Sequence, residues 1–155
     1  MAYVALVIGA KGQGKSTFIK NMIEAKPNYI FDVQNEYQDY NPAPHLDRNL
    51  FIQECLSYTD TFCVLEEATG FFKGALSANT DRMILGARHT NNRYIFCFHS
   101  IRAVPPGIMA MVNFVVLFKT LDEPNEIKRK YYRLLNPYMQ LQKMKQYSKI
   151  IIKMI

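Results

Sequence analysis

Apolar residues in this chain gather into short uninterrupted runs that are separated by longer amphipathic segments. The runs are rich in aliphatic and aromatic residues, and they cover residues 3–8, 29–32, 61–65, 94–98 and 114–118. Such runs are typical of strands buried on both faces, because a strand with one face in water would alternate with polar residues. Residues 16–25 instead place apolar side chains at positions 18, 19, 22 and 23, which is the spacing of a helix that buries one side.

The rest of the pattern predicts less regular elements. They are a short strand at residues 50–52 leading into a helix near Cys55, a helix over residues 81–89 closed by Asn91 and Asn92, a break at residues 105–107, a basic helix from about residue 126 interrupted by Pro137, and a last strand at residues 150–152. Buried strands that alternate with helices indicate an α/β fold with a mostly parallel sheet covered on both faces. At 155 residues we expect one compact domain over residues 1–155.

A glycine-rich segment joins the first predicted strand to the first predicted helix. Its sequence is Gly9-Ala10-Lys11-Gly12-Gln13-Gly14-Lys15-Ser16, followed by Thr17. It fits the pattern G-x-x-x-x-G-K-[ST], in which glycines let main-chain N–H groups curl around phosphate oxygens and the helix N-terminus adds its positive dipole end. Lys15 would bridge the β- and γ-phosphates, and the Ser16 hydroxyl would bind Mg²⁺. The sequence therefore predicts a P-loop NTPase fold that binds ATP and Mg²⁺ through residues 9–17.

An acidic pair, Glu66 and Glu67, follows the most apolar internal strand at residues 61–65. Ligands of such sheets bind at the carboxyl ends of the strands, so both side chains are expected near the phosphates. Glu66 could orient the waters around Mg²⁺, and Glu67 could position and polarise the attacking water. The alternative is an exposed acidic pair that begins a loop, but its place after a buried strand favours function.

Further polar residues follow or precede the next strand, residues 94–98. His99 and Ser100 end it, where a polar group could sense the γ-phosphate or hold the attacking water, although a lone histidine is more often structural. Arg88 stands eleven residues before His99 and could reach a phosphate bound to a neighbouring subunit, as an arginine finger does. The competing arginines are Arg82, Arg93 and Arg102.

The net charge of +6 lies in the C-terminal part of the chain. Residues 119–155 hold nine Lys and Arg against three acidic residues, and no acidic residue follows Glu126. A basic segment over about residues 126–155 is expected to contact a polyphosphate such as a nucleic acid or an anionic membrane, or else to be a solvated surface. Three cysteines without a C-x-x-C pairing and the lack of a signal peptide or transmembrane run indicate a reducing cytoplasm.

Several segments together resemble the HerA/FtsK class of P-loop ATPases. They are the P-loop, Tyr29-Ile30-Phe31-Asp32 with Asn35-Glu36-Tyr37, the acidic pair in residues 64–68, Gly86-Ala87-Arg88-His89, residues 95–100 and residues 113–118. Within that class the chain is most similar to the small genome-packaging ATPases of tailless, membrane-containing icosahedral viruses. It is next most similar to the Zot-like ATPases of filamentous phages. The resemblance covers roughly residues 3–135.

The resemblance implies roles for individual residues and for partners. Lys15 and Ser16 would take the phosphate and Mg²⁺ roles, Glu67 the catalytic role, and Arg88 the role of the finger. Such ATPases form rings, usually hexamers, that move DNA through a central pore, here to package a viral genome through capsid or viral membrane proteins. The chain departs from the class in having Glu66 where Asp is usual and His99 where Gln is usual. The sensor role therefore stays open between His99 and Ser100.

One loop is a candidate for contact with DNA. Residues 69–74 follow the acidic pair and combine two glycines, two aromatic rings and Lys73. The aromatic rings could stack on bases, or they could pack on the core.

Two other functions are open, a Zot-like ATPase for phage extrusion and a small nucleotide kinase. A second carboxylate aimed at the γ-phosphate argues against a kinase, because a kinase must exclude water.

Overall fold

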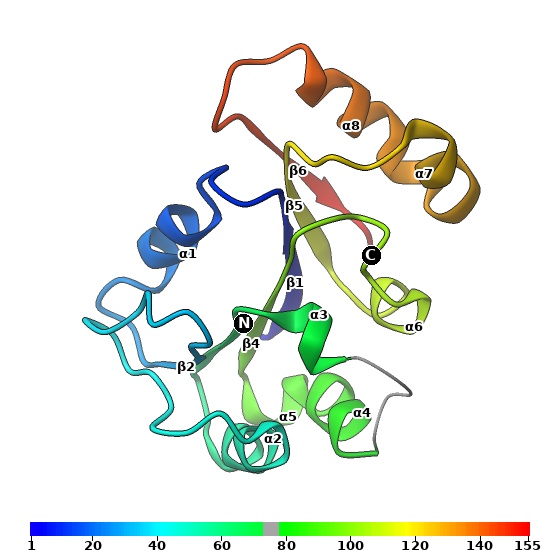
Figure 1. Cartoon of the computed structure of the whole chain (residues 1–155). Coiled ribbons are helices and arrows are strands. Elements are labelled where there is room, and N and C mark those ends of the chain that lie inside the picture. Colours follow the sequence, from blue (N-terminus) through cyan, green and yellow to red (C-terminus); the bar gives the residue numbers. More distant parts are fainter. Residues whose placement is uncertain (73–77) are drawn as a thin grey trace.

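The computed structural model describes residues 1–72 and 78–155, and the side chains of residues 70, 71 and 78–80 lie outside that description. Within these residues one six-stranded sheet forms the centre of the molecule, in the order β2-β3-β4-β1-β5-β6 (Figure 1). The strands are β1 (Tyr3–Ile8), β2 (Asn28–Phe31), β3 (Phe62–Leu65), β4 (Arg93–Phe98), β5 (Phe114–Phe118) and β6 (Lys149–Lys153). The first five run parallel, which confirms the α/β prediction, whereas β6 pairs antiparallel with β5.

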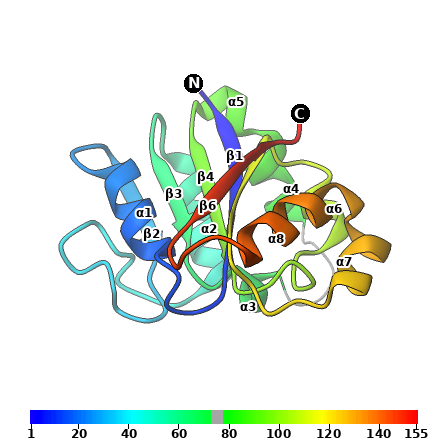
Figure 2. The ribbon, with the colours of Figure 1, turned by 90° about the horizontal axis from the view of Figure 1, so that it is seen from above.

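The helices connect these strands. They are α1 (Lys15–Ile23), α2 (Arg48–Ser57), α3 (Ala68–Phe71), α4 (Ala78–Leu85), α5 (Ala87–Thr90), α6 (Pro106–Met109), α7 (Pro124–Lys130), the 3-10 turn η1 (Tyr132–Leu134) and α8 (Leu135–Gln142). Seen along the sheet in Figure 2, α1 stands on one side and α6, α7 and α8 stand on the other. The two faces of the sheet are therefore covered unequally.

Two hydrophobic clusters reflect this unequal cover. On one face, Ile19 and Ile23 of α1 pack with strand residues such as Val7 and Val116. On the opposite face a larger cluster joins the strands to side chains from all the other helices, α2 to α8. Because neighbouring strand residues point to opposite faces, uninterrupted apolar runs supply both clusters at once. The helices expected on both faces are present, and within the described part of the chain α1 is the single helix on one of them.

The segment over residues 50–52 is helical, and the strand that the sequence suggested there is wrong. Asp47 begins α2 by accepting a hydrogen bond from the Leu50 N–H at 3.1 Å, which satisfies one of the free donors of the first turn. The buried side chains Phe51, Ile52 and Cys55 then lie on one helix face. A short apolar run of this kind fits a strand or a helix equally well, and the capping residue decides between them.

Two predicted helices are broken at positions that the sequence did not indicate. The helix over residues 81–89 is divided into α4 and α5 at Gly86, where a Cβ would lie 2.5 Å from the Arg82 carbonyl oxygen. The basic helix breaks at Tyr131 and η1, and Pro137 lies in the first turn of α8. A proline there loses nothing, because the N–H groups of the first turn have no partner within the helix. At residues 105–107, where the sequence predicted a break, Pro105 is the N-cap of α6 and the next two residues form its start.

Candidate nucleotide-binding site

The carboxyl ends of three neighbouring strands bring the predicted site residues together. β1 lies between β4 and β5, and β3 lies beside β4, all in parallel register. The loop after β1, the acidic pair after β3 and His99 after β4 therefore meet at one edge of the sheet. A cavity of about 410 Å³ opens at this edge, lined by P-loop residues together with Glu36, Glu66, Glu67, His99 and Tyr147.

The loop between β1 and α1 has the backbone that a phosphate-binding loop requires. Gly12 and Gly14 have φ angles of 80° and 99°, a region that side chains other than glycine rarely adopt. Gly9 also has no room for a side chain, since a Cβ there would lie 2.7 Å from the Cβ of Phe118. Gly14 caps α1, so the N–H groups of the first helical turn face the cavity.

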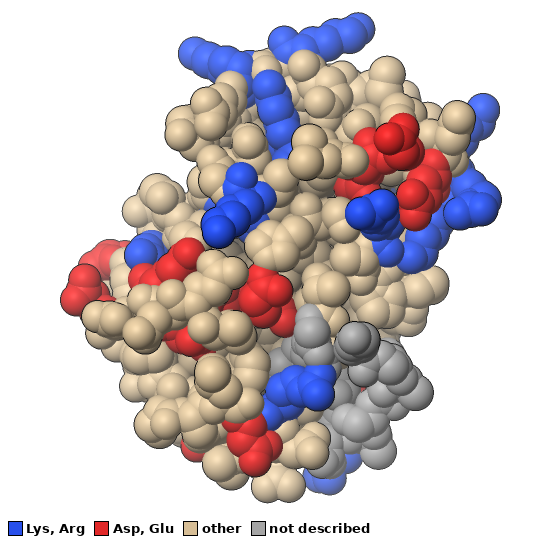
Figure 3. Space-filling model, viewed as in Figure 1, with Lys and Arg blue, Asp and Glu red and all other residues tan. Residues whose placement is uncertain are grey.

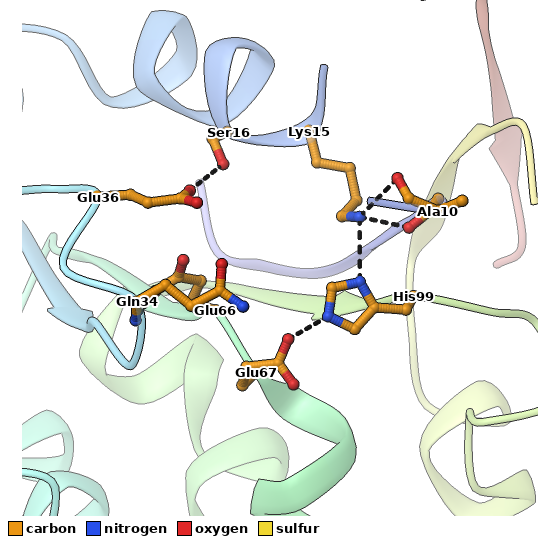
Figure 4. Close-up of polar contacts among 9 residues, drawn as sticks. Ala10, Lys15, Ser16, Gln34, Glu36, Glu66, Glu67 and His99 are labelled. Carbon is orange, nitrogen blue, oxygen red and sulfur yellow. Dashed lines mark hydrogen bonds and ion pairs between the residues drawn. The ribbon is translucent and has the colours of Figure 1, made fainter. Parts of the chain in front are cut away.

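Lys15 is the first residue of α1, and its ammonium group lies in the cavity (Figure 4). Nζ donates to the carbonyl oxygens of Gly9 and Ala10, the latter at 3.2 Å, and lies 3.5 Å from His99 Nδ1. Burial lowers the pKa of Lys15, and the carboxylates of Glu67 and Glu36 oppose that shift. An anion in the cavity would replace the carbonyl partners, because a charge-assisted bond to phosphate is stronger.

Ser16 is bound to a residue that the sequence analysis gave no role of its own. Its hydroxyl donates to Glu36 Oε2 at 2.6 Å. Glu36 is held in turn by the buried Asp32, whose Oδ1 accepts from the Glu36 N–H at 2.9 Å and whose Oδ2 accepts from the Tyr37 N–H at 3.0 Å. The Asp-x-x-x-Glu-Tyr spacing was the sequence signal that could have pointed to Glu36, because an Asp after a strand often accepts hydrogen bonds from the backbone of a following turn.

Glu66 is buried, with 8% of the residue exposed, and its Oε2 accepts from the Gln34 N–H at 3.3 Å. Burial and a hydrogen bond with the Asp32 carboxyl raise the pKa of Glu66 to about 8. A carboxyl group in such surroundings is mainly protonated at pH 7, and a nearby cation would lower its pKa. Glu66 lines the cavity, where its carboxyl oxygens could bind such a cation.

Glu67 and His99 contact each other directly, which the sequence could not show. His99 Nε2 is bound to Glu67 Oε1, while Nδ1 of the same ring faces Lys15 Nζ (Figure 4). A neutral ring with its proton on Nε2 satisfies both contacts, because it donates to the carboxylate and accepts from the ammonium. His99 thus connects the two charged groups, whereas Ser100, which the structure also describes, does not line this cavity.

Comparison with known proteins identifies the fold. No family model and no curated protein matches this chain. The genome packaging NTPase B204 from Sulfolobus turreted icosahedral virus 2, solved with ATP-gammaS, matches with a TM-score of 0.80 at 20% identity over 98% of this chain and 92% of that chain. The N-terminal domain of zonular occludens toxin from Neisseria meningitidis matches with a TM-score of 0.61 at 10% identity, over 83% and 90%. The Legionella pneumophila ATPase DotB matches with a TM-score of 0.51 at 13% identity, over 87% and 52%.

The chain has the P-loop NTPase fold. The predicted residues Lys15, Ser16, Glu66, Glu67 and His99 all line one cavity of this fold. The sequence analysis missed Tyr147, because nothing in its local pattern connects it with a loop more than a hundred residues away.

No helix in the described part of the chain is long and apolar enough to cross a membrane.

Arg88 is not part of this cavity. It is an exposed residue of α5, which directly precedes the amino end of β4, whereas His99 follows the carboxyl end. The length of the strand, about 20 Å for six residues, separates the two. Arg88 therefore cannot reach a phosphate in the P-loop of its own subunit. Arg93 lies at the same amino edge, with its guanidinium 5.0 Å from the Phe62 ring centroid.

The segment proposed to contact DNA, residues 69–74, is described only in part. Phe72 is buried against Phe96 and Phe98, with ring centroids 5.1 Å and 6.4 Å away. It belongs to the core, as one of the two readings of the sequence allowed. Lys73 and Gly74 lie outside the described residues.

Proposed function

We propose that this protein is an ATP-hydrolysing, ring-forming translocase that packages viral DNA into a capsid. The observation that carries the proposal is the convergence of Lys15, Glu67 and His99 in one cavity beside the P-loop. A P-loop alone binds a nucleotide, whereas a carboxylate opposite the phosphate-binding lysine can place and polarise an attacking water. The likeness to the genome packaging NTPase B204 over nearly the whole chain supports this function rather than another P-loop activity.

The residues around Ser16 fit a magnesium ion. A hydroxyl and two carboxyl groups, those of Glu36 and Glu66, offer the oxygen ligands that Mg²⁺ prefers. Mg²⁺ usually keeps several waters and is held by one or two protein groups together with substrate phosphates. When bound with ATP, Mg²⁺ would neutralise charge on the phosphates. Ser16 would leave Glu36 to bind it, and Glu36 would hold a water beside it.

The ring and the DNA are proposed from the resemblance and from the position of Arg88. An arginine at the edge of the sheet opposite to the P-loop can meet the P-loop of a second copy only if the copies are arranged head to tail. Head-to-tail contacts that close make a ring, and we expect six subunits. A Zot-like function in phage extrusion is the second candidate, supported by the likeness to the N-terminal domain of zonular occludens toxin.

The test of the proposed function is ATP-driven movement along DNA. The parent protein should release a third strand from a triplex in the presence of ATP and Mg²⁺. Lys15→Ala should release none and should not bind ATP in calorimetry, because the loop loses its only cation at the β/γ-phosphate position. The partly exposed Lys20 of α1 has its ammonium over the Tyr37 ring and does not line the cavity, so Lys20→Ala is the matched control and should behave as the parent. ATP hydrolysis without strand release in the parent protein would contradict the translocase.

The basic segment over residues 126–155 is predicted to contribute salt-sensitive affinity for DNA. Figure 3 shows its Lys and Arg side chains along the upper edge of the molecule and over α7. Each phosphate contact contributes a slope of roughly −0.9 in log K against log salt on duplex DNA. Lys143→Gln with Lys145→Gln, in the turn after α8, should therefore flatten the measured slope by up to about 2. An unchanged slope would leave these lysines as a solvated surface or a capsid contact.

A further inference from the structure

A second cavity adjoins the P-loop on the side away from Glu67 and His99. It has a volume of about 450 Å³ and shares Gly14, Thr17 and Tyr147 with the phosphate cavity. Its other lining residues are Phe18, Asn21, Phe118 and Lys149. We name it the Tyr147 pocket. The two cavities therefore lie on either side of the last glycine of the P-loop.

The position of this pocket relative to the catalytic groups suits the other end of a nucleotide. Glu67 and His99 follow β3 and β4, so the γ-phosphate would lie on that side of the loop. Phe118 and Lys149 belong to β5 and β6, on the opposite side of β1. A triphosphate that runs through the P-loop away from the catalytic groups therefore brings its nucleoside to the Tyr147 pocket.

The lining of the pocket suits a flat heteroaromatic base. The rings of Tyr147 and Phe118 both approach Gly14, since a Cβ there would lie 3.5 Å from Tyr147 Cδ1 and 3.7 Å from Phe118 Cε1. Phe18 packs edge-on against Phe118 at 6.1 Å, and the Lys149 ammonium lies 5.3 Å from the centroid of the Phe18 ring. Aromatic surfaces stack on any base, and Asn21 and Lys149 add polar groups at the rim.

The turn that carries Tyr147 is connected to the P-loop through Lys119. Its backbone has a φ angle of 69°, an uncommon conformation for a bulky residue, and 60% of the residue is exposed. Lys119 connects the two segments, because its carbonyl oxygen accepts from the Ala10 N–H at 2.9 Å and its Nζ donates to the Met144 carbonyl oxygen. The turn that carries Tyr147 is thus tied to the loop that would hold the phosphates.

We propose that the Tyr147 pocket binds the base of the nucleoside triphosphate, with the Tyr147 ring stacked on it. This inference rests on the proposed ATP binding. It assigns the turn between α8 and β6, far from the P-loop in sequence, to nucleotide recognition. Lys149 then belongs to this pocket rather than to the DNA-contacting lysines of the basic segment.

Calorimetric titration with ATPγS and with inorganic tripolyphosphate tests the pocket. Tyr147→Ala should weaken ATPγS binding by about 5- to 150-fold, the range of base–aromatic stacking, and should leave tripolyphosphate binding unchanged. Tyr147→Phe keeps the ring and should bind ATPγS within about 2-fold of the parent. The matched control is Tyr132→Ala, which removes another exposed tyrosine, of η1, that lies outside the pocket.

A fluorescence measurement provides an independent readout. The chain contains no tryptophan, so Tyr147→Trp introduces a single reporter at the pocket. ATPγS should quench its fluorescence by stacking, and tripolyphosphate should not. If the parent binds ATPγS but Tyr147→Ala binds it equally tightly, the pocket is wrong while the proposed function stands. If the parent binds neither ATPγS nor tripolyphosphate, the proposed function and the pocket both fail.

Discussion

Glu67→Gln is expected to bind ATP as tightly as the parent protein and to hydrolyse it about 10²- to 10⁴-fold more slowly. The substitution leaves the P-loop and Lys15 intact, so the groups that hold the phosphates remain. It removes the carboxylate that His99 contacts and that faces the phosphate-binding lysine across the cavity. A neutral amide of the same size cannot take a proton from the attacking water.

Two measurements separate the expected outcomes. Calorimetry with a non-hydrolysable ATP analogue reports binding, and a phosphate-release assay reports turnover. Lys15→Ala should fail in both, whereas Glu67→Gln should fail only in the second. Glu123→Gln removes an exposed carboxylate at the start of α7, away from the cavity, and should match the parent in both. Hydrolysis by Glu67→Gln at the parent rate would show that another group activates the water.

Arg88→Ala is expected to bind ATP and to lose about 10³- to 10⁵-fold of its hydrolysis rate, the usual contribution of an arginine finger. Negative charge develops on the γ-phosphate in the transition state. Within the same subunit, Lys15 is the one cation that the P-loop motif places beside that phosphate. Arg88 lies beyond the amino end of β4 and can therefore act only on a neighbouring subunit. Hydrolysis would then require the assembled ring.

Mixing two inactive proteins tests whether Arg88 acts in trans. Arg88→Ala subunits keep Glu67, and Glu67→Ala subunits keep Arg88. In a random one-to-one mixture about one interface in four combines an intact Glu67 with an intact Arg88 across a head-to-tail contact. Up to about a quarter of the parent activity should therefore return.

Arg82→Ala is the control for Arg88→Ala. Arg82→Ala removes an exposed arginine of the adjacent α4 and should be active without mixing. No recovery in mixed rings whose assembly has been verified, or normal turnover by Arg88→Ala alone, would contradict the assignment. The finger would then have to be Arg82, Arg93 or Arg102. Of these, Arg102 follows His99 at the carboxyl edge of the sheet.

The five parallel strands could be read from the sequence because burial on both faces leaves an uninterrupted apolar run. Residues 3–8 and 114–118 are apolar throughout, and each forms a strand within one residue of the predicted bounds. The antiparallel direction of β6 could not be read, because a run such as Ile150-Ile151-Ile152 has the same composition in either orientation. The helix at residues 50–52 was misjudged for the related reason that three apolar residues carry no period.

The sequence by itself determined the phosphate-binding loop and the acidic pair, since both depend on neighbours in the chain. A loop of this kind requires glycines at fixed offsets before a helix, and Glu66 and Glu67 follow directly from the strand before them. Tertiary structure decided the contact of His99 with Glu67, the bond of Ser16 to Glu36 and the approach of Tyr147 to Gly14. These contacts join residues that are 20 to 133 positions apart, and the order of strands in the sheet, which local sequence does not encode, brings them together.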